Sequence, residues 1–365
     1  MIILLSYRKA EIVEILEENQ DIAYVNVRID ETNSKAINYN KLTGRVSIGD
    51  IVIVNTTAVE LSLGTGGVHF VIFNYSNENK NTEGQGHIMK LRYTPHQIRC
   101  LAAEEENSPY YEVFQNFKSL DGHIFIIGSL HSMLAPIVAM LKYLNEDIKI
   151  NYIMTDGGSL PIDFSNTVRD LKSKKLIENT ITIGHAFGGD LECINIYTGL
   201  IAAKEVLKGD ITIITMGPGI VGTGTKYGFS GIEQGYILDA VNTLGGKAVL
   251  VPRISFKDSR KRHYGISHQT RTVLSEIAKT SGTVIFPILD KDKLGLLKKQ
   301  IDLLDLNGKH NIIYMPGDNI DKAMNSFKLN IKTMGRDYKD DKEYFLTLGA
   351  VGNYVIELLN KGGLN

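Results

Sequence analysis

The chain contains 365 residues, of which 43% are hydrophobic and 22% charged, and it carries a formal net charge of −1. This length fits two domains, or one large α/β domain with an appendage, and the apolar fraction is sufficient for a substantial core. Because positive and negative charges balance, the composition gives no reason to expect a nucleic acid or an anionic membrane as a partner.

Targeting and membrane segments are also disfavoured by the sequence. The N-terminal apolar run, MIILL, is about five residues long, which is too short for the hydrophobic region of a signal peptide. No other stretch reaches the roughly 18 uncharged apolar residues of a membrane-spanning helix. We therefore expect a cytoplasmic protein, in which Cys100 and Cys193 are reduced thiols rather than a disulfide.

The first hundred residues contain short apolar or β-branched runs that are separated by turn residues. Close spacing of such runs without a long helical pattern is typical of a small barrel or sandwich. We expect this β module to span residues 1–95 and to contain no helix longer than about three turns. Its predicted strands are 23–29, 35–39, 50–57, 69–75 and 86–93.

After a predicted linker, 96–122, strands and helices alternate along the chain. The strands are near-continuous hydrophobic runs, the pattern of a parallel sheet that is buried on both faces. We therefore expect residues 123–365 to form a doubly wound α/β domain with a largely parallel sheet. Its predicted strands are 123–129, 149–155, 180–184, 211–216, 247–252, 283–288 and 311–315.

The densest chemical signal is GPGIVGTGTKYGFSGIEQG, which follows the predicted strand 211–216. Glycine allows positive φ and a close approach of the backbone to a ligand, and successive N–H groups in such a loop can hold an anion. We expect a preformed ligand loop, with Ser230 and Glu233 opening the next helix. The residues predicted to bind the ligand are Gly217, Gly219, Gly222, Thr223, Gly224, Thr225 and Lys226.

Two nucleotide-binding motifs fit this segment only in part. Residues 217–222 match the dinucleotide fingerprint G-x-G-x-x-G after a predicted strand. Pro218, however, removes one backbone donor, and the residue after the following strand is Arg253 rather than an acid. Residues 219–226 have the glycine spacing of a P-loop, but Thr-Lys stands where the motif requires Lys followed by Ser or Thr. The cofactor is therefore unknown from the sequence.

Polar residues follow other predicted strands too, and the carboxyl ends of parallel strands share the sheet edge where ligands bind. His185 lies between glycines at a strand end, so it is a candidate proton carrier with Asp156 and Asp190. An Asx turn explains Asp156 equally well, and helix capping explains Asp190. The spacing of these three residues matches no known metal site, so no metal is expected. His131, near a helix N-terminus, is expected to bind the ligand as neutral imidazole.

The segment 257–271, KDSRKRHYGISHQTR, is the only strongly basic cluster in the sequence. One interpretation is a solvated surface loop. The other is an anion clamp that includes Arg253 and His268, because guanidinium groups hold phosphate or carboxylate through two bonds. Tyr264 is its one aromatic residue, which argues against a platform for single-stranded nucleic acid. Both interpretations remain open.

The chain resembles an uncharacterised bacterial family, a domain of unknown function, in four segments: TTAVELSLGTGGVHFV, GHAFGGDLECINIYTGLIAAKEVL, MGPGIVGTGTKYGFSGIEQG and VPRISFKDSRKRHYGISHQT. The resemblance covers nearly the whole chain. It implies a bacterial intracellular protein and carries over no catalytic residue.

These observations lead to two hypotheses about function. The first is an enzyme that acts on a small anionic metabolite, bearing phosphate or carboxylate, at the carboxyl edge of the parallel sheet. The second is a non-catalytic ligand- or dinucleotide-binding regulator that assembles as a homo-oligomer. For the enzyme we predict that Asp156, His185, Gly219 and Arg253 converge at one pocket.

Overall fold

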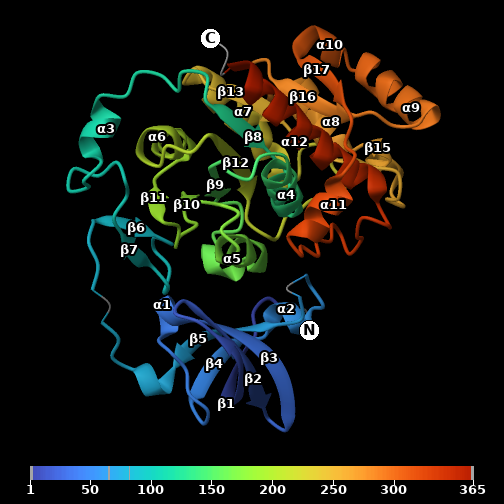
Figure 1. Cartoon of the computed structure of the whole chain (residues 1–365). Coiled ribbons are helices and arrows are strands. Elements are labelled where there is room, and N and C mark those ends of the chain that lie inside the picture. Colours follow the sequence, from blue (N-terminus) through green and yellow to red (C-terminus); the bar gives the residue numbers. More distant parts are fainter. Residues whose placement is uncertain (1–2, 65, 82, 363–365) are drawn as a thin grey trace. The chain divides into compact units, whose positions relative to one another are not determined.

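The computed structural model describes residues 3–64, 66–81 and 83–362, and the chain divides into two compact units, residues 1–100 and 101–365 (Figure 1). Each unit has its own hydrophobic core. Residues 1–2, 65, 82 and 363–365 lie outside the described residues. The predictions for the N-terminal run at 1–2, for the β module at 65 and 82, and for the α/β domain at 363–365 therefore lie outside the described residues.

The first unit contains a closed five-stranded barrel with the strand order β1-β2-β3-β5-β4. Strands β3 and β5 pair in parallel, and the remaining neighbours pair antiparallel. Alternate side chains point inward, so that Val25 and Val27 are fully buried while Asn26 between them is not. The strands are β1 (Tyr7–Glu18), β2 (Ile22–Ile29), β3 (Thr32–Tyr39), β4 (Ile51–Asn55) and β5 (His69–Asn74).

The predicted barrel is confirmed, with two differences at its ends. The longest strand, β1, was not predicted. The predicted strand 86–93 is the short β6 (Ile88–Lys90), which pairs outside the barrel with β7 (Ile98–Cys100). The helices of this unit, α1 (Asn40–Thr43) and α2 (Thr57–Glu60), have four residues each, in keeping with the expected absence of a long helix from the described part of 1–95.

The second unit is built on a parallel sheet of eight strands in the order β11-β10-β9-β12-β8-β13-β16-β17. The predicted doubly wound sheet is therefore confirmed, and β11 is an additional edge strand. The strands are β8 (Ile124–Ile127), β9 (Ile150–Thr155), β10 (Asn179–Ile183), β11 (Leu191–Cys193), β12 (Ile211–Met216), β13 (Lys247–Leu250), β16 (Thr283–Pro287) and β17 (Asn311–Met315).

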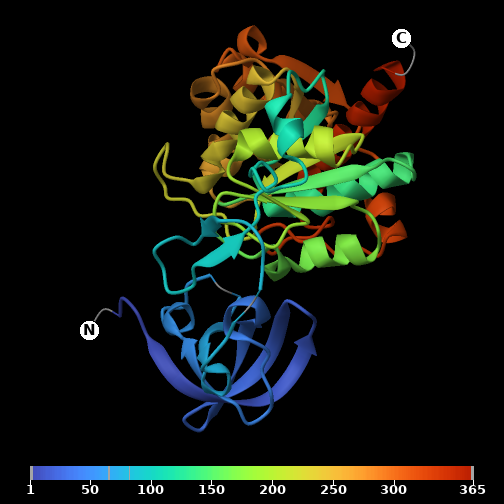
Figure 2. The ribbon, with the colours of Figure 1, turned by 90° about the vertical axis from the view of Figure 1, so that its left-hand side faces the viewer.

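Helices cover both faces of this sheet, and Figure 2 shows them on either side of the strands. In β8, Ile124 and Ile126 join one core while Phe125 and Ile127 join the other, as the two-residue period of a strand requires. The first face packs against α4 (Leu134–Leu144), α5 (Asn166–Ser173), α11 (Ile320–Ser326) and α12 (Lys342–Gly362). The second face packs against α3 (Tyr111–Gln115), α6 (Ile196–Ile201), α7 (Glu233–Thr243), α9 (Lys291–Asp302) and α10 (Leu306–Lys309).

Two helices on the second face change character along their length. Helix α6 continues as the π-helix η4 (Ala202–Val206), and α8 (His268–Thr272) continues as the π-helix η7 (Val273–Ile277). Single π-helical turns inside helices are frequent at functional sites. Two two-residue strands, β14 (Ile254–Ser255) and β15 (Gly265–Ile266), pair just before α8.

The segment expected as a linker, 96–122, is ordered and divides between the two units. Its first part holds β7, and its second part packs within the second unit, where Ala103 N–H donates to Glu192 O and Leu120 is fully buried. Within the described residues, no helix combines the length and the apolar character needed to span a bilayer.

Candidate functional site

A cavity of about 320 Å³ lies where the loops after β8 and β12 diverge. These strands are neighbours, but the chain leaves β8 through α4 on one face and leaves β12 through α7 on the other. Such a switch point opens a crevice at the carboxyl edge of a parallel sheet, which is the usual ligand site of this architecture. The residues that line this switch-point cavity are Leu130, His131, Ser132, Thr167, Pro218, Gly219, Ile220, Asn330, Ile331, Lys332, Thr333 and Met334.

Glu233 is the first residue of α7 and lies partly buried at this edge. Its Oε1 accepts a hydrogen bond of 2.6 Å from Thr155 Oγ1, at the end of β9. Burial raises the pKa of Glu233 to about 7; the bond from Thr155 opposes this rise, and the nearby Asp156 carboxylate adds to it. A carboxyl group that titrates near neutral pH is suited to both giving and taking a proton.

The structure brings together Asp156 and His185, two of the predicted catalytic residues. Asp156 Oδ2 accepts a hydrogen bond of 3.2 Å from the backbone N–H of His185. The carboxylate packs against Gly184, which has a φ of +62°, and a Cβ there would lie 2.2 Å from Asp156 Oδ2. Glycine is therefore required at 184 for both reasons. Asp156, His185 and Glu233 form what we call the acid–base cluster.

The loop after β9 connects the acid–base cluster to the switch-point cavity. A Cβ on Gly157 would lie 3.9 Å from Glu233 Oε2, and a Cβ on Gly158 would lie 3.6 Å from the carbonyl oxygen of Pro218, which lines the cavity. The loop thus runs between the acid–base cluster on one side and the cavity wall on the other, while the three cluster residues do not line the cavity itself.

His131 lines the cavity, and both of its ring nitrogens have hydrogen-bond partners. Its Nδ1 lies 3.2 Å from Met216 O, and its Nε2 lies 2.6 Å from Ser165 Oγ. Because a carbonyl oxygen only accepts, Nδ1 carries the proton and Nε2 accepts from the Ser165 hydroxyl. Burial lowers the pKa of His131 to about 4, so the imidazole is neutral near pH 7, as expected, although burial rather than a helix N-terminus is the main cause. His131 is thus a fixed wall residue rather than a proton carrier.

The glycine-rich segment, which is predicted to be a preformed ligand loop, forms an antiparallel hairpin. Gly222 bridges to Phe229, and Thr223 N–H donates to Gly228 O at 2.7 Å. Thr225 N–H donates to Thr223 Oγ1 at 3.2 Å. Two of the N–H groups that were predicted to contact a ligand therefore serve the hairpin itself. We call residues 219–229 the glycine hairpin.

The tip of the glycine hairpin is fastened to the π-helix η7. Lys226 Nζ lies 2.5 Å from Glu276 Oε1, and Tyr227 OH donates to Glu276 Oε2 at 2.7 Å. Lys226, which is predicted to bind the ligand through its charge, thus forms an ion pair within the protein. At the base of the segment, Gly217 is buried against Met154, whereas Gly219, with a φ of +103°, lines the switch-point cavity.

Arg253 lies behind the cavity wall in a buried network of charges. Its side chain is 6% exposed, and its Nη2 lies 3.4 Å from Asp258 Oδ2. Asp258 binds Arg260 more tightly, at 2.7 Å, and hydrogen bonds from Arg260, opposed by burial, hold the pKa of Asp258 well below its usual range. Arg253 also acts electrostatically on Tyr344, whose hydroxyl lies 2.8 Å from Ser132 Oγ on the wall. Of the four residues predicted to converge, Asp156 and His185 touch, Gly219 lines the cavity and Arg253 lies behind its wall.

The basic segment 257–271 is only partly a surface loop. Lys257 and Arg262 are exposed, but Asp258 and His263 are buried. His268, a predicted ligand residue, opens α8 and lies with its ring 4.8 Å from that of His263. The buried half of this segment therefore faces the protein interior beside Arg253.

Asp190, the third predicted catalytic residue, lies near the other end of β10. Its carboxylate accepts hydrogen bonds of 2.8 Å from Thr180 N–H and from the Thr180 hydroxyl, and it pairs with Lys172 at 2.6 Å. About 15 Å of extended strand separates Thr180 from His185. The structure thus shows that Asp190 fixes the turn into β11, and its catalytic role stays a prediction.

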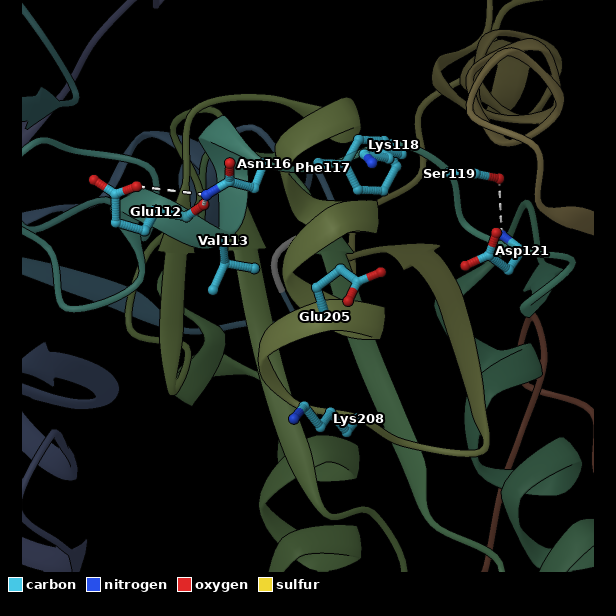
Figure 3. Close-up of a pocket in the computed structure, with 9 residues that line it drawn as sticks. All are labelled: Glu112, Val113, Asn116, Phe117, Lys118, Ser119, Asp121, Glu205 and Lys208. Carbon is cyan, nitrogen blue, oxygen red and sulfur yellow. Dashed lines mark hydrogen bonds between the residues drawn. The ribbon is translucent and has the colours of Figure 1, made fainter.

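A larger cavity, of about 540 Å³, opens at the amino edge of the sheet between the region of α3 and the end of η4 (Figure 3). It contains acidic and basic side chains, including Glu112, Lys118, Asp121, Glu205 and Lys208, and none of the predicted site residues. Its position at the amino edge is not where ligands bind in parallel sheets, so we place the site at the carboxyl edge. Within residues 3–64, 66–81 and 83–362, no three His, Cys, Asp or Glu residues are grouped so as to hold a metal ion.

Sequence reasoning placed Glu233 only at a helix start and missed its chemical role. The signal that was present is an acidic residue in the first turn of a helix that follows a glycine-rich loop. Its raised pKa comes from burial and from the Asp156 carboxylate, which lies 77 positions earlier in the chain and which only the folded sheet brings close. Ser165, the partner of His131, gave no signal in the sequence.

The fold defines a two-unit α/β protein, in which a switch-point cavity opens at the carboxyl edge of a parallel sheet. The chain belongs to the family described as "Protein of unknown function (DUF3866)", whose model matches residues 35–352. The match begins in β3 of the barrel and extends into α12. Comparison with curated proteins gives no match.

Proposed function

We propose that the protein is an enzyme that acts on a small anionic metabolite in the switch-point cavity, with Glu233 as the group that donates or accepts a proton. The observation that carries the proposal is the raised pKa of Glu233, about 7, at the edge of the sheet where ligands bind. General acid–base catalysis is most effective when the pKa of the catalytic group lies near the working pH.

Asp156 and His185 have supporting roles in this proposal. The Asp156 carboxylate raises the pKa of Glu233 and, through the backbone N–H of His185, fixes the loop after β10. In this proposal the side chain of His185 is the partner of Glu233, and the two groups supply an acid and a base on one substrate.

The anionic character of the substrate is supported by the charges at the cavity. Lys332 lines the cavity and is exposed, and Arg253 acts electrostatically on Tyr344, whose hydroxyl contacts Ser132 on the cavity wall. The hydroxyl groups of Ser132 and Thr333 add uncharged donors on the same wall. A bacterial cytoplasmic setting and assembly into a homo-oligomer remain parts of the proposal, and the setting rests on the family resemblance and the composition.

The proposal is tested by following the turnover of a panel of phosphorylated and carboxylated metabolites by NMR. We expect wild-type protein to convert at least one of them, and Glu233→Gln to lower its kcat by about 10²- to 10⁴-fold, the usual contribution of a general acid or base. Glu112→Gln, at the exposed amino edge, is the matched control and should retain the wild-type rate.

Two results would contradict this proposal. One is equal turnover by wild type and Glu233→Gln, which would remove Glu233 from the chemistry. The other is binding of an anion without turnover of any panel member, which would favour the ligand-binding regulator instead.

A further inference from the structure

Two buried nitrogen atoms near α8 have no hydrogen-bond partner among the described residues: Nε2 of His268 and Nε of Arg271. The two residues are three positions apart, so their side chains lie on the same side of the helix. Folded proteins rarely leave buried polar atoms unpaired, and those that remain commonly await a ligand, an ion or water. These two nitrogen atoms therefore mark a place where acceptor atoms of a ligand would fit.

The surroundings of His268 carry an excess of positive charge. Burial lowers the pKa of His268, and the nearby guanidinium groups of Arg262, Arg271, Arg253 and Arg260 lower it further. Two carboxylates lie in this network: Asp258, which Arg260 engages at 2.7 Å, and Asp341, which Arg336 engages at 2.9 Å. Guanidinium groups outnumber these carboxylates, and the excess of positive charge around His268 attracts an anion.

The glycine hairpin covers this basic group. The ring of Phe229 lies 6.1 Å from that of His268, edge to face. A Cβ on Gly222 would lie 2.9 Å from Gln269 Nε2, so the backbone of the hairpin packs directly on α8. The hairpin is thus the element that separates His268 and its neighbours from solvent on this side.

The hairpin has an unconfined base, and its tip is held by exposed contacts. Gly219 at its base has a φ of +103°, and a Cβ there would meet no atom within 4 Å. The tip is held by the pairs that Lys226 and Tyr227 make with Glu276, and the Lys226 side chain is 55% exposed. Exposed ion pairs of this kind are weak, so the tip can be released at low cost.

We propose that His268 and Arg271, with Arg253 beside them, bind a phosphoryl group, and that the glycine hairpin is the lid of this site, latched by Glu276. A phosphoryl group carries up to two charges and three acceptor oxygen atoms, which matches the excess of guanidinium groups better than a carboxylate does. The inference rests on the proposed function only in assigning the phosphoryl group to the substrate.

The test is titration calorimetry of the full chain with inorganic phosphate, with acetate at equal ionic strength as the comparison. We expect phosphate to bind more tightly than acetate, and Arg271→Gln and His268→Gln each to weaken phosphate binding at least about tenfold. Arg271→Lys should weaken it as well, because lysine keeps the charge but lacks the planar Nε donor. Lys257→Gln, which removes an exposed charge from the same segment, should change the affinity less than about twofold.

The lid is tested separately with Glu276→Gln, a substitution at a partly exposed position that frees the hairpin tip. We expect this variant to bind phosphate with a higher association rate constant, measured by stopped flow. Thermal unfolding without phosphate checks that each variant is folded.

Unchanged phosphate affinity in both Arg271→Gln and His268→Gln, or the absence of phosphate binding by wild type, would overturn the site. An association rate constant that Glu276→Gln leaves unchanged would overturn the lid. Phosphate binding that depends on Arg271 without turnover of any metabolite would contradict the proposed function and leave this site intact. Turnover of carboxylates without phosphate binding would overturn this site and leave the proposed function intact.

Discussion

Burial brings the pKa of Glu233 to about 7, whereas the ordinary value for glutamate is 4.5. The carboxyl group opens α7, where the helix dipole alone would favour the charged form, so the neutral form reflects the dominance of desolvation. The same surroundings keep the carboxyl hydrogen-bonded to Thr155 and within the electrostatic influence of Asp156. Glu233 thus lies at the carboxyl edge of the sheet, where ligands bind, and exchanges its proton near neutral pH.

This shift predicts how stability depends on pH. Between pH 4.5 and 7 the unfolded chain has released the Glu233 proton and the folded chain has kept it, so the free energy of unfolding falls as pH rises through this window. Glu233→Gln removes that contribution. The difference in unfolding free energy between Glu233→Gln and wild type should therefore shift in favour of the variant by up to about 3 kcal/mol between pH 4 and pH 8. Urea denaturation of both proteins across this pH range measures the difference, with Glu112→Gln as the control. A difference that is constant with pH would contradict the shift.

At the scale of elements, the glycine hairpin connects three parts of the second unit. Its base lines the switch-point cavity, its arms pack on α8, and its tip is bound to η7. Helix α8 in turn carries the basic residues, and η7 carries Glu276. A movement of the hairpin would therefore alter the cavity wall and the surroundings of His268 together.

Two glycines of the hairpin should respond differently to substitution by alanine. A Cβ on Gly222 would press on Gln269 at 2.9 Å, whereas a Cβ on Gly224 would meet no atom within 4 Å. We expect Gly222→Ala to loosen the packing of the hairpin on α8, at a cost of about 1 kcal/mol because Gln269 can yield. Gly224→Ala should be neutral.

Hydrogen exchange at the amide of Thr223, which donates to Gly228 O, reports on this difference. Protection should fall in Gly222→Ala and stay at the wild-type level in Gly224→Ala. Equal protection in the two variants would mean that the hairpin does not depend on its contact with α8.

At the scale of the whole molecule, the pattern of the sequence predicted the fold class because most strands of the large sheet are near-continuous apolar runs. The missed strand, β1, has register shifts at Ile12/Glu14 and Ile15/Glu17, and these irregularities break the two-residue period by which a strand is recognised. Asp156 and His185 were predicted as neighbours because strand ends of a parallel sheet share an edge. The pKa of Glu233 and the pairing of Thr223 with Gly228 depend on packing that no local pattern encodes.

The central claim is that the Glu233 carboxyl titrates near neutral pH at the carboxyl edge of the sheet. It can be measured without knowledge of the substrate, by ¹³C NMR titration of the side-chain carboxyl groups. The Glu233 resonance is assigned by its absence from Glu233→Gln. The account predicts a titration midpoint near 7 for this resonance. A midpoint near 4.5, the ordinary value of a glutamate, would contradict it.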